Sequence, residues 1–260
     1  MVAAIGKIVL DASEALGGVA KMWRETLGAL MKGQWVPKLT IAQVMEIGVR
    51  SFPVVGLTSL FTGMVLAFQS GFSFIKVFNE PIYVGSVVGL SLVKELGPVL
   101  TSMVIAGRVG AAIAAEIGTM NVTEQLDALY TLGTNPVRYL AVPRYIAVMV
   151  MVPILTALSD MIGIWGGYVV ANLQLKIPAS VYWEEVKTFV DMGDVNHGLI
   201  KAFFFGLIIV TTSCYKGFKC QGGAEGVGKA TTSAVVVSMV LILVGDYFLS
   251  SLLVSLGIGG

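Results

Sequence analysis

Long apolar stretches constrain this chain more than any other feature of its sequence. The interior of a bilayer holds no water, so backbone groups there must bond within their own segment, and a helix needs about 20 apolar residues to cross. The chain is 56% hydrophobic and 13% charged, with a mean hydropathy of +0.85. The apolar stretches that meet or approach the required length lie at 52–74, 82–118, 140–173, 199–215 and 232–256. We therefore predict an all-α, polytopic membrane protein with five transmembrane helices.

The N-terminal segment has a different pattern. Its apolar residues recur every three or four positions, and charged residues such as Lys7 and Asp11 interrupt them. That pattern is typical of an amphipathic helix that lies in the membrane interface rather than crossing it. We expect one domain over residues 1–260, with this interfacial helix at 1–38 and a transmembrane bundle at 52–256.

The second apolar stretch, 82–118, is too long for a simple crossing. As a helix it would extend roughly 55 Å, so it must bend or project from the bilayer, and Pro98 is the obvious place for a bend. Small residues recur at every fourth position in its later part, which favours close packing against another helix. These residues are Ala106, Gly110, Ala114 and Gly118.

The distribution of Lys and Arg predicts the orientation. Most of them fall on one side of the five spans, and only Lys76, Lys176, Lys187 and Lys201 fall on the other. Cytoplasmic loops carry the excess of positive residues. The N-terminus and the segment 119–139 are therefore predicted to be cytoplasmic, and the C-terminus is predicted to lie outside, in the periplasm.

Several polar residues are predicted to lie at membrane depth: Lys94, Glu95, Asp160 and Asp246, with Gln69 as a milder case. Such groups are costly in a bilayer and usually face a cavity or a partner. One interpretation is a structural ion pair or polar network that holds the bundle together. The other is a polar wall of a substrate cavity, in which Lys94 would suit an anionic headgroup.

A short polar helix is predicted at 121–132, between the second and third spans. Thr123, Glu124, Gln125 and Asp127 lie on it, and Thr123 suits the position of an N-terminal cap. A solvated polar face is one explanation of this composition. A docking element for a soluble partner is the other, because the helix leaves the membrane and the chain then returns to it directly.

Other functional classes receive little support. A net charge of +1 suggests no nucleic-acid partner. Residues 216–230 are predicted to form a loop, and its GAEGVGK resembles a phosphate-binding loop, but Ala230 follows it where Ser or Thr is required. His197 is the sole histidine, so a metal site has weak support. We expect no cofactor in this chain.

The run ELGPVLTSMVIAGRVGAAIAAEIGTMNVTEQLDALYTLGTNPVRYLAVPR at 95–144 closely resembles the signature of the MlaE-type permeases. These are the membrane subunits of ABC transporters associated with MCE proteins. The resemblance extends to 63–69, 162–167 and 229–236, and we take it to cover the whole chain.

The resemblance implies a permease subunit rather than an enzyme. It would act as a homodimer in the bacterial inner membrane and move phospholipids between the inner and outer membranes, which maintains outer-membrane lipid asymmetry. Its partners would be a cytoplasmic ABC ATPase that binds the ATP, a small STAS-domain protein and a periplasmic MCE-domain protein.

The resemblance also favours roles for particular residues. Lys94 and Glu95 match the motif that lines the lipid pocket, and we add Gln69 and Asp246 as substrate-binding candidates because of their depth. Residues on the 121–132 helix match the family's coupling helix, which binds the ATPase. The coupling candidates are Thr123, Glu124, Gln125 and Asp127.

Two rival functions remain. A proton-coupled secondary transporter would use Glu95, Asp160 and Asp246 as proton carriers, but it would not need the 119–136 helix. A membrane scaffold without transport would leave Lys94 and Glu95 hard to explain.

Overall fold

The computed structural model describes residues 2–31, 36–78 and 83–259, with only part of the side chains before residue 16. Helices form nearly all of this part of the chain. Four short π-helical turns, η1 to η4, interrupt them. In order the elements are α1 (Val2–Met31), α2 (Pro37–Val44), η1 (Met45–Val49), α3 (Phe52–Phe78), α4 (Val84–Ser91), η2 (Leu92–Leu96), α5 (Gly97–Ile105), η3 (Ala106–Gly110), α6 (Ala111–Val122), α7 (Gln125–Thr131), η4 (Val137–Ala141), α8 (Val142–Leu173), α9 (Ala179–Phe189), α10 (Met192–Phe218) and α11 (Gly223–Ser255).

Five helical segments in the described ranges are long and apolar enough to cross a membrane, which confirms the predicted fold class. They are Pro37–Val77, Val84–Val122, Val137–Leu173, Met192–Phe218 and Gly223–Ser255. The first of these joins α2 to α3, and the second runs unbroken from α4 to α6 through two π turns.

The prediction of a loop over residues 216–230 is wrong. α10 continues to Phe218 and α11 already begins at Gly223, so only four residues connect them. Gly222, with a φ of 90°, makes the turn, and the glycines after it lie inside the helix. Glu225 and Lys229 support that first turn of α11 with an ion pair of 2.6 Å.

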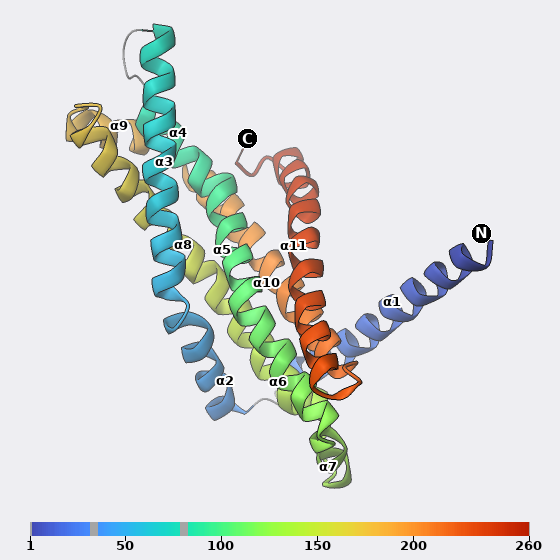
Figure 1. Ribbon diagram of the computed structural model, residues 1–260. Coiled ribbons are helices and arrows are strands. Elements are labelled where there is room, and N and C mark those ends of the chain that lie inside the picture. The colour runs from blue at the N-terminus through green and yellow to red at the C-terminus, as the bar shows by residue number, and fades with distance from the viewer. Residues whose placement is uncertain (1, 32–35, 79–82, 260) are drawn as a thin grey trace.

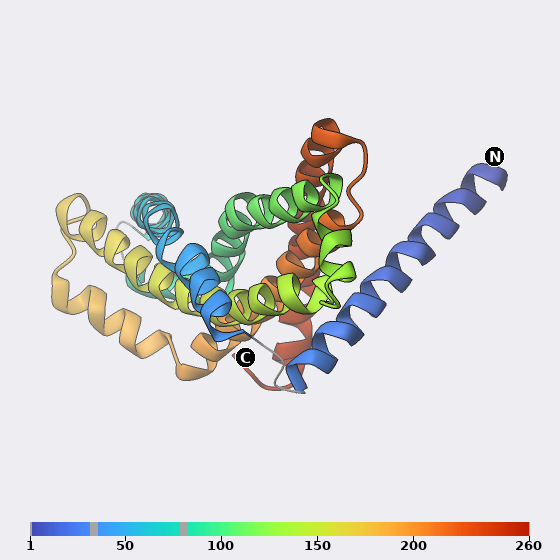
Figure 2. The same ribbon diagram turned by 90° about the horizontal axis from the view of Figure 1, so that it is seen from below.

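α1 extends away from the bundle in both views (Figures 1 and 2). It is helical as predicted and is not among the five candidate spans. Residues 32–35 of the predicted 1–38 helix lie outside the described residues. That α1 lies in the membrane interface stays a prediction.

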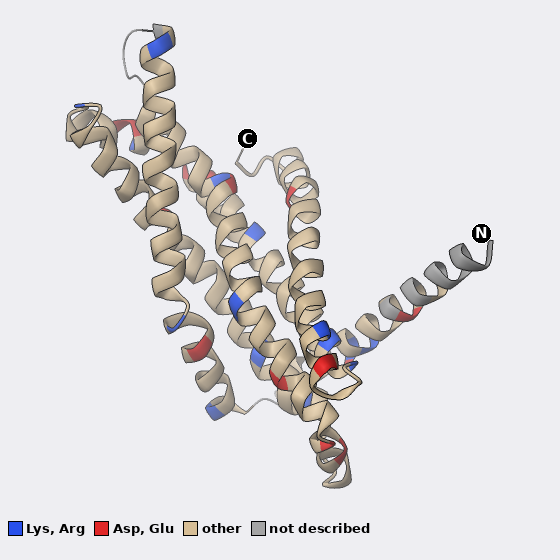
Figure 3. Cartoon of the chain, viewed as in Figure 1, with Lys and Arg blue, Asp and Glu red and all other residues tan. Residues whose placement is uncertain are grey.

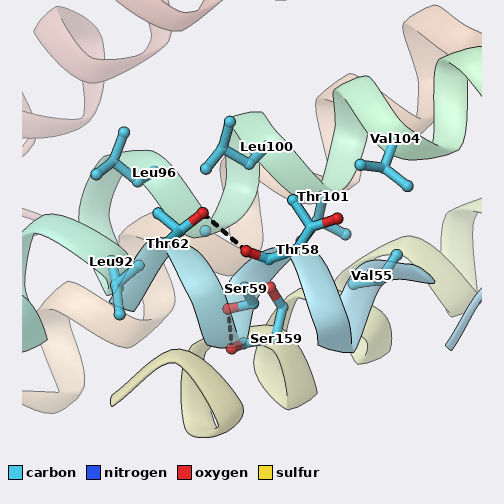
Figure 4. A pocket seen from close by; sticks show the side chains of 11 residues that line it. Val55, Thr58, Ser59, Thr62, Leu92, Leu96, Leu100, Thr101, Val104 and Ser159 are labelled. Carbon is cyan, nitrogen blue, oxygen red and sulfur yellow. Dashed lines mark hydrogen bonds between the residues drawn. The ribbon is translucent and has the colours of Figure 1, made fainter. Parts of the chain in front are cut away.

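The tightest helix contact joins α3 to α8. At Gly63 the carbonyl of Gly163 comes so close that there is no room for a side chain, and Ser59 Oγ donates to the Ser159 carbonyl at 2.5 Å. Figure 4 shows this contact beside a small cavity between α3, α5 and α8. The cavity of about 10 Å³ is lined partly by hydroxyl groups and is large enough for one water molecule.

The remaining helices complete two hydrophobic clusters. One lies among α5, α6, α8 and α10, around buried residues such as Ile105, Tyr145 and Phe205. The other joins α3, α4, α8 and α9 at the opposite end, around Val84 and Tyr182. α11 packs against α10 and α6 on one side, while much of its other face is exposed and apolar.

Candidate functional site

Lys201 of α10 is the centre of a charged cluster within the bundle. Its side chain is 0% exposed, and its ammonium group contacts Glu95 Oε2 of η2 at 2.5 Å and Asp246 Oδ1 of α11 at 2.5 Å. It also donates to Ser250 Oγ at 2.9 Å, and Ser250 in turn donates to Glu95 Oε1 at 3.2 Å. Three helical segments that are distant in the sequence therefore meet at one cation. We call Lys201, Glu95, Asp246 and Ser250 the Lys201 cluster.

Pro98 explains why Lys201 also contacts the backbone of η2. Proline has no N–H, so the Lys94 carbonyl four residues earlier lacks its helical donor. Lys201 Nζ donates to that carbonyl at 3.0 Å. The π turn η2 lies directly before Pro98, and in it the Gly97 N–H donates to the Leu92 carbonyl; the bend predicted at Pro98 stays a prediction.

α10 can approach η2 this closely because Gly198 lies at the contact. A side chain at Gly198 would collide with the Val93 carbonyl. Gly198 lies about one turn before Lys201, so the small residue and the ammonium group face the same neighbour.

Lys94 and Glu95 do not pair with each other. Lys94 Nζ lies 3.0 Å from Asp194 Oδ1 at the start of α10, whereas Glu95 belongs to the Lys201 cluster. Asp194 also accepts from the Asp191 N–H at 3.0 Å, as part of a capping box. Both residues are thus held by α10, at two levels of the same helix.

Lys201 was predicted to lie on the outer side of the spans and was not among the candidate site residues. α10 begins at Met192, seven residues earlier than predicted, so Lys201 lies about 13 Å along the helix rather than at its end. The capping pattern of Asp191 and Asp194 was the signal for the earlier start.

Two of the other three residues predicted at membrane depth lie outside the Lys201 cluster. Gln69 is exposed on α3, in a face with apolar residues such as Val65 and Phe72. Asp160 of α8 is buried beside Gly97, and its Oδ1 has no hydrogen-bond partner in the part of the chain that the structure describes. Asp246 alone of the three joins Glu95. Figure 3 shows that charged positions are sparse along the spans and gather near the end that carries α7.

α7 is the short polar helix at one end of the bundle (Figure 1). It begins at Gln125, because Glu124 with a φ of 59° separates it from α6. Thr123 does not cap α7 as predicted: its hydroxyl donates to the Thr119 carbonyl at 2.8 Å and so belongs to the end of α6. Thr123, Glu124, Gln125 and Asp127 are all exposed, and Leu126 anchors the helix from its buried side.

Several side-chain contacts connect this end to the neighbouring elements. Asn121 Nδ2 donates to the Cys220 carbonyl at 2.7 Å, which ties α6 to the α10–α11 connection. Lys219 Nζ donates to Glu14 Oε1 of α1 at 2.6 Å. This bond and the charge of Lys219 hold the pKa of Glu14 below its usual value.

Comparison with known proteins identifies the family. The model of the family described as Permease MlaE matches residues 40–252. A probable ABC transporter permease protein of Rickettsia typhi is 44% identical over 251 residues, covering 96% of both chains. The intermembrane phospholipid transport system permease protein MlaE of Haemophilus influenzae is 35% identical over 260 residues, covering 98% of both. The chloroplastic protein TRIGALACTOSYLDIACYLGLYCEROL 1 of Arabidopsis thaliana is 39% identical over 223 residues, 85% of this chain and 63% of the plant protein. The chain therefore belongs to the MlaE permease family and is an ABC transporter permease.

Proposed function

We propose that this protein moves phospholipids between the inner and outer membranes of a bacterium and so maintains outer-membrane lipid asymmetry. The name of the Haemophilus relative supports phospholipid as the substrate class. The observation that carries the proposal is the contrast within the Lys201 cluster. Lys201 is 0% exposed, whereas the side chains of Glu95 and Asp246 are 46% and 22% exposed. The cluster thus presents carboxylates outward from a buried cation, at membrane depth.

Such a surface does not suit direct contact with acyl chains. Exposed charge at membrane depth faces a cavity or a partner. The exposed apolar side chains of α11, including Tyr247 and Phe248, lie next to Asp246 in the sequence. A second copy packed along α11 would cover them and enclose the carboxylates in a cavity between the two chains. This arrangement supports a homodimer with lipid bound between the copies, with Glu95, Asp246 and Lys94 in its wall.

The transport energy would come from a separate ATPase. In the proposal this subunit binds ATP and docks on α7, through the exposed residues Thr123, Glu124, Gln125 and Asp127. The end with α7 is then cytoplasmic, together with the N-terminus, and the C-terminus is periplasmic in the inner membrane. An MCE-domain protein would bind on the periplasmic side, and a small STAS-domain protein would complete the complex.

The proton-coupled alternative receives no support from the comparisons, since the chain groups with ABC permeases. Within the described residues no hydrogen bond or ion pair joins Asp160 to Glu95 or Asp246, so the contacts give no support to a relay of the three carboxylates. Gln69 stays a weaker substrate-binding proposal, because it lies on an exposed face away from the cluster.

The proposal is tested by neutralising the carboxylates in the purified complex. We expect Glu95→Gln and Asp246→Asn to lower co-purified phospholipid, measured by mass spectrometry, and lipid transfer between vesicles. Glu225→Gln is the matched control, because Glu225 is an exposed carboxylate at the other end of α11. Wild-type lipid content and transfer in both cluster variants would refute a substrate-binding role for these carboxylates.

A further inference from the structure

A second pocket with charged walls lies between α2 and α6, away from the Lys201 cluster. Its volume is about 190 Å³. Its walls carry polar side chains, and its floor is apolar, formed by Ile47, Val109, Ala112 and Ile113. We call it the Arg108 pocket, and its polar residues are Gln43, Glu46, Arg108 and Glu116.

The pocket lies at the level of a membrane surface. Arg108 follows Val84, the start of its span, by 24 positions, or roughly 36 Å of helix, which exceeds the bilayer core of about 30 Å. On the other wall, Glu46 lies just before Phe52, where α3 begins. Both walls contain a π turn, η1 around Glu46 and η3 around Arg108.

Two carboxylates at this pocket already have partners. Glu46 pairs with Arg50 at 2.5 Å, and Glu116 pairs with the buried Arg144 at 2.6 Å. Arg108 is a third guanidinium and shares Glu46 with Arg50, through a longer ion pair of 3.7 Å between its Nη2 and Glu46 Oε1. The group of five therefore carries one positive charge in excess.

The hydrogen bonds of Arg108 are also incomplete. Its Nη1 donates to Ser51 Oγ at 2.5 Å and to the Glu46 carbonyl at 3.4 Å. A guanidinium has five N–H donors. Within the described residues, Nε and Nη2 make no hydrogen bond, although Ser51 holds the group in place. A fixed guanidinium with free donors is suited to a phosphate group, which it binds through two parallel bonds.

We propose that the Arg108 pocket binds the phosphate of a phospholipid in the membrane leaflet at the α7 end. A free phosphate ion has the same charge, but the surroundings favour a lipid. The pocket floor is apolar, and the neighbouring face of α2 and η1 exposes Ile41, Met45 and Val49, on which acyl chains can lie. The site would be a second lipid contact, separate from the substrate cavity.

The test is a lipid titration of the purified permease–ATPase complex, read by native mass spectrometry. Dioleoylphosphatidylglycerol is the probe, and dioleoylglycerol has the same chains without the phosphate. We expect Arg108→Gln to weaken one phosphatidylglycerol-binding event about tenfold, since hydrogen bonds between two charged groups are stronger than those between neutral ones. Binding of dioleoylglycerol should not change.

Arg50→Gln is the matched control, because it removes one positive charge beside the same Glu46 but leaves Arg108 intact. It should keep the binding event. Arg108→Lys retains the charge without the two-pronged geometry and should weaken binding by a smaller factor. If Arg108→Gln does not fold, the Arg108→Lys variant provides the test instead.

Unchanged phosphatidylglycerol binding in the folded Arg108 variants would overturn the proposal. So would an equal loss in Arg50→Gln, which would indicate diffuse attraction. Displacement of the lipid by millimolar inorganic phosphate would assign the site to a soluble anion and overturn the lipid proposal. The Glu95→Gln variant is titrated in parallel: it should keep this event, so failure of the substrate-cavity proposal and failure of this one give different results.

Discussion

Replacing Lys201 with methionine should destabilise the protein strongly. Methionine keeps much of the length and the apolar stem but removes the ammonium group. Glu95 and Asp246 then face each other without the cation that both contact at 2.5 Å. The Lys94 carbonyl, which lacks the usual helical donor four residues on because of Pro98, also loses the lysine as a partner. Breaking a buried ion pair by removing one member costs about 3–5 kcal/mol.

This cost corresponds to a large thermal shift. For a chain of this size, 1 kcal/mol changes the melting temperature by about 2–4 °C, so Lys201→Met should lower it by about 6–20 °C. The assay is thermal unfolding of the detergent-purified protein. Lys229→Met is the control, because its exposed pair with Glu225 contributes only about 0.3–0.5 kcal/mol.

A compensated variant separates the loss of charge balance from the loss of packing. Lys201→Met combined with Glu95→Gln and Asp246→Asn leaves no unpaired charge and should recover the part of the lost stability that comes from the two carboxylates, while the Lys94 carbonyl stays without its lysine donor. A melting temperature of Lys201→Met within about 2 °C of wild type, less than the shift from 1 kcal/mol, would refute the reasoning. So would a triple variant less stable than the single one.

Three further predictions concern packing and docking. Gly63→Ala should lower thermal stability because the new methyl group meets a backbone carbonyl of α8, whereas Gly228→Ala, with open space around it, should not. Gly110→Leu should disrupt packing against α10, where a Cβ already lies 3.0 Å from a side-chain oxygen; a dimer of unchanged thermal stability would contradict this. Glu124→Lys or Asp127→Lys should leave the protein inserted but reduce co-purification of the ATPase, since both side chains are exposed on or beside α7; wild-type recovery with both variants would count against docking there.

The spans were predictable from the sequence because length and hydropathy decide them. The positions at which the helices begin and end were harder to predict. Glycines at 223–228 are typical of a loop in a soluble protein, but here they form the first turns of a membrane-length helix, and α11 starts nine residues before the prediction. The short polar helix was predicted at the right place, but its start was misassigned because Glu124 adopts a left-handed conformation, which its residue type does not indicate.

The partners of the charged residues were not predictable. The side chains of adjacent helical residues point about 100° apart, so Lys94 and Glu95 were expected to contact different partners. Their spacing does not indicate which helices those partners belong to. That depends on how three spans are rotated against one another. A π turn adds a residue to the turn and shifts every following side chain around the axis, and η2 does this at Glu95 itself.

Three separate features of the sequence become one feature in the fold. Pro98 frees the Lys94 carbonyl, Gly198 lets α10 approach the same turn, and Lys201 supplies a donor to that carbonyl and a cation to Glu95. An ammonium group that bonds only carboxylates can be replaced together with them by neutral residues. One that also satisfies a backbone carbonyl fixes its own position along the helix. The carbonyl that Pro98 leaves without its usual donor therefore helps to fix the position of Lys201, and with it the cation of the cluster, on α10.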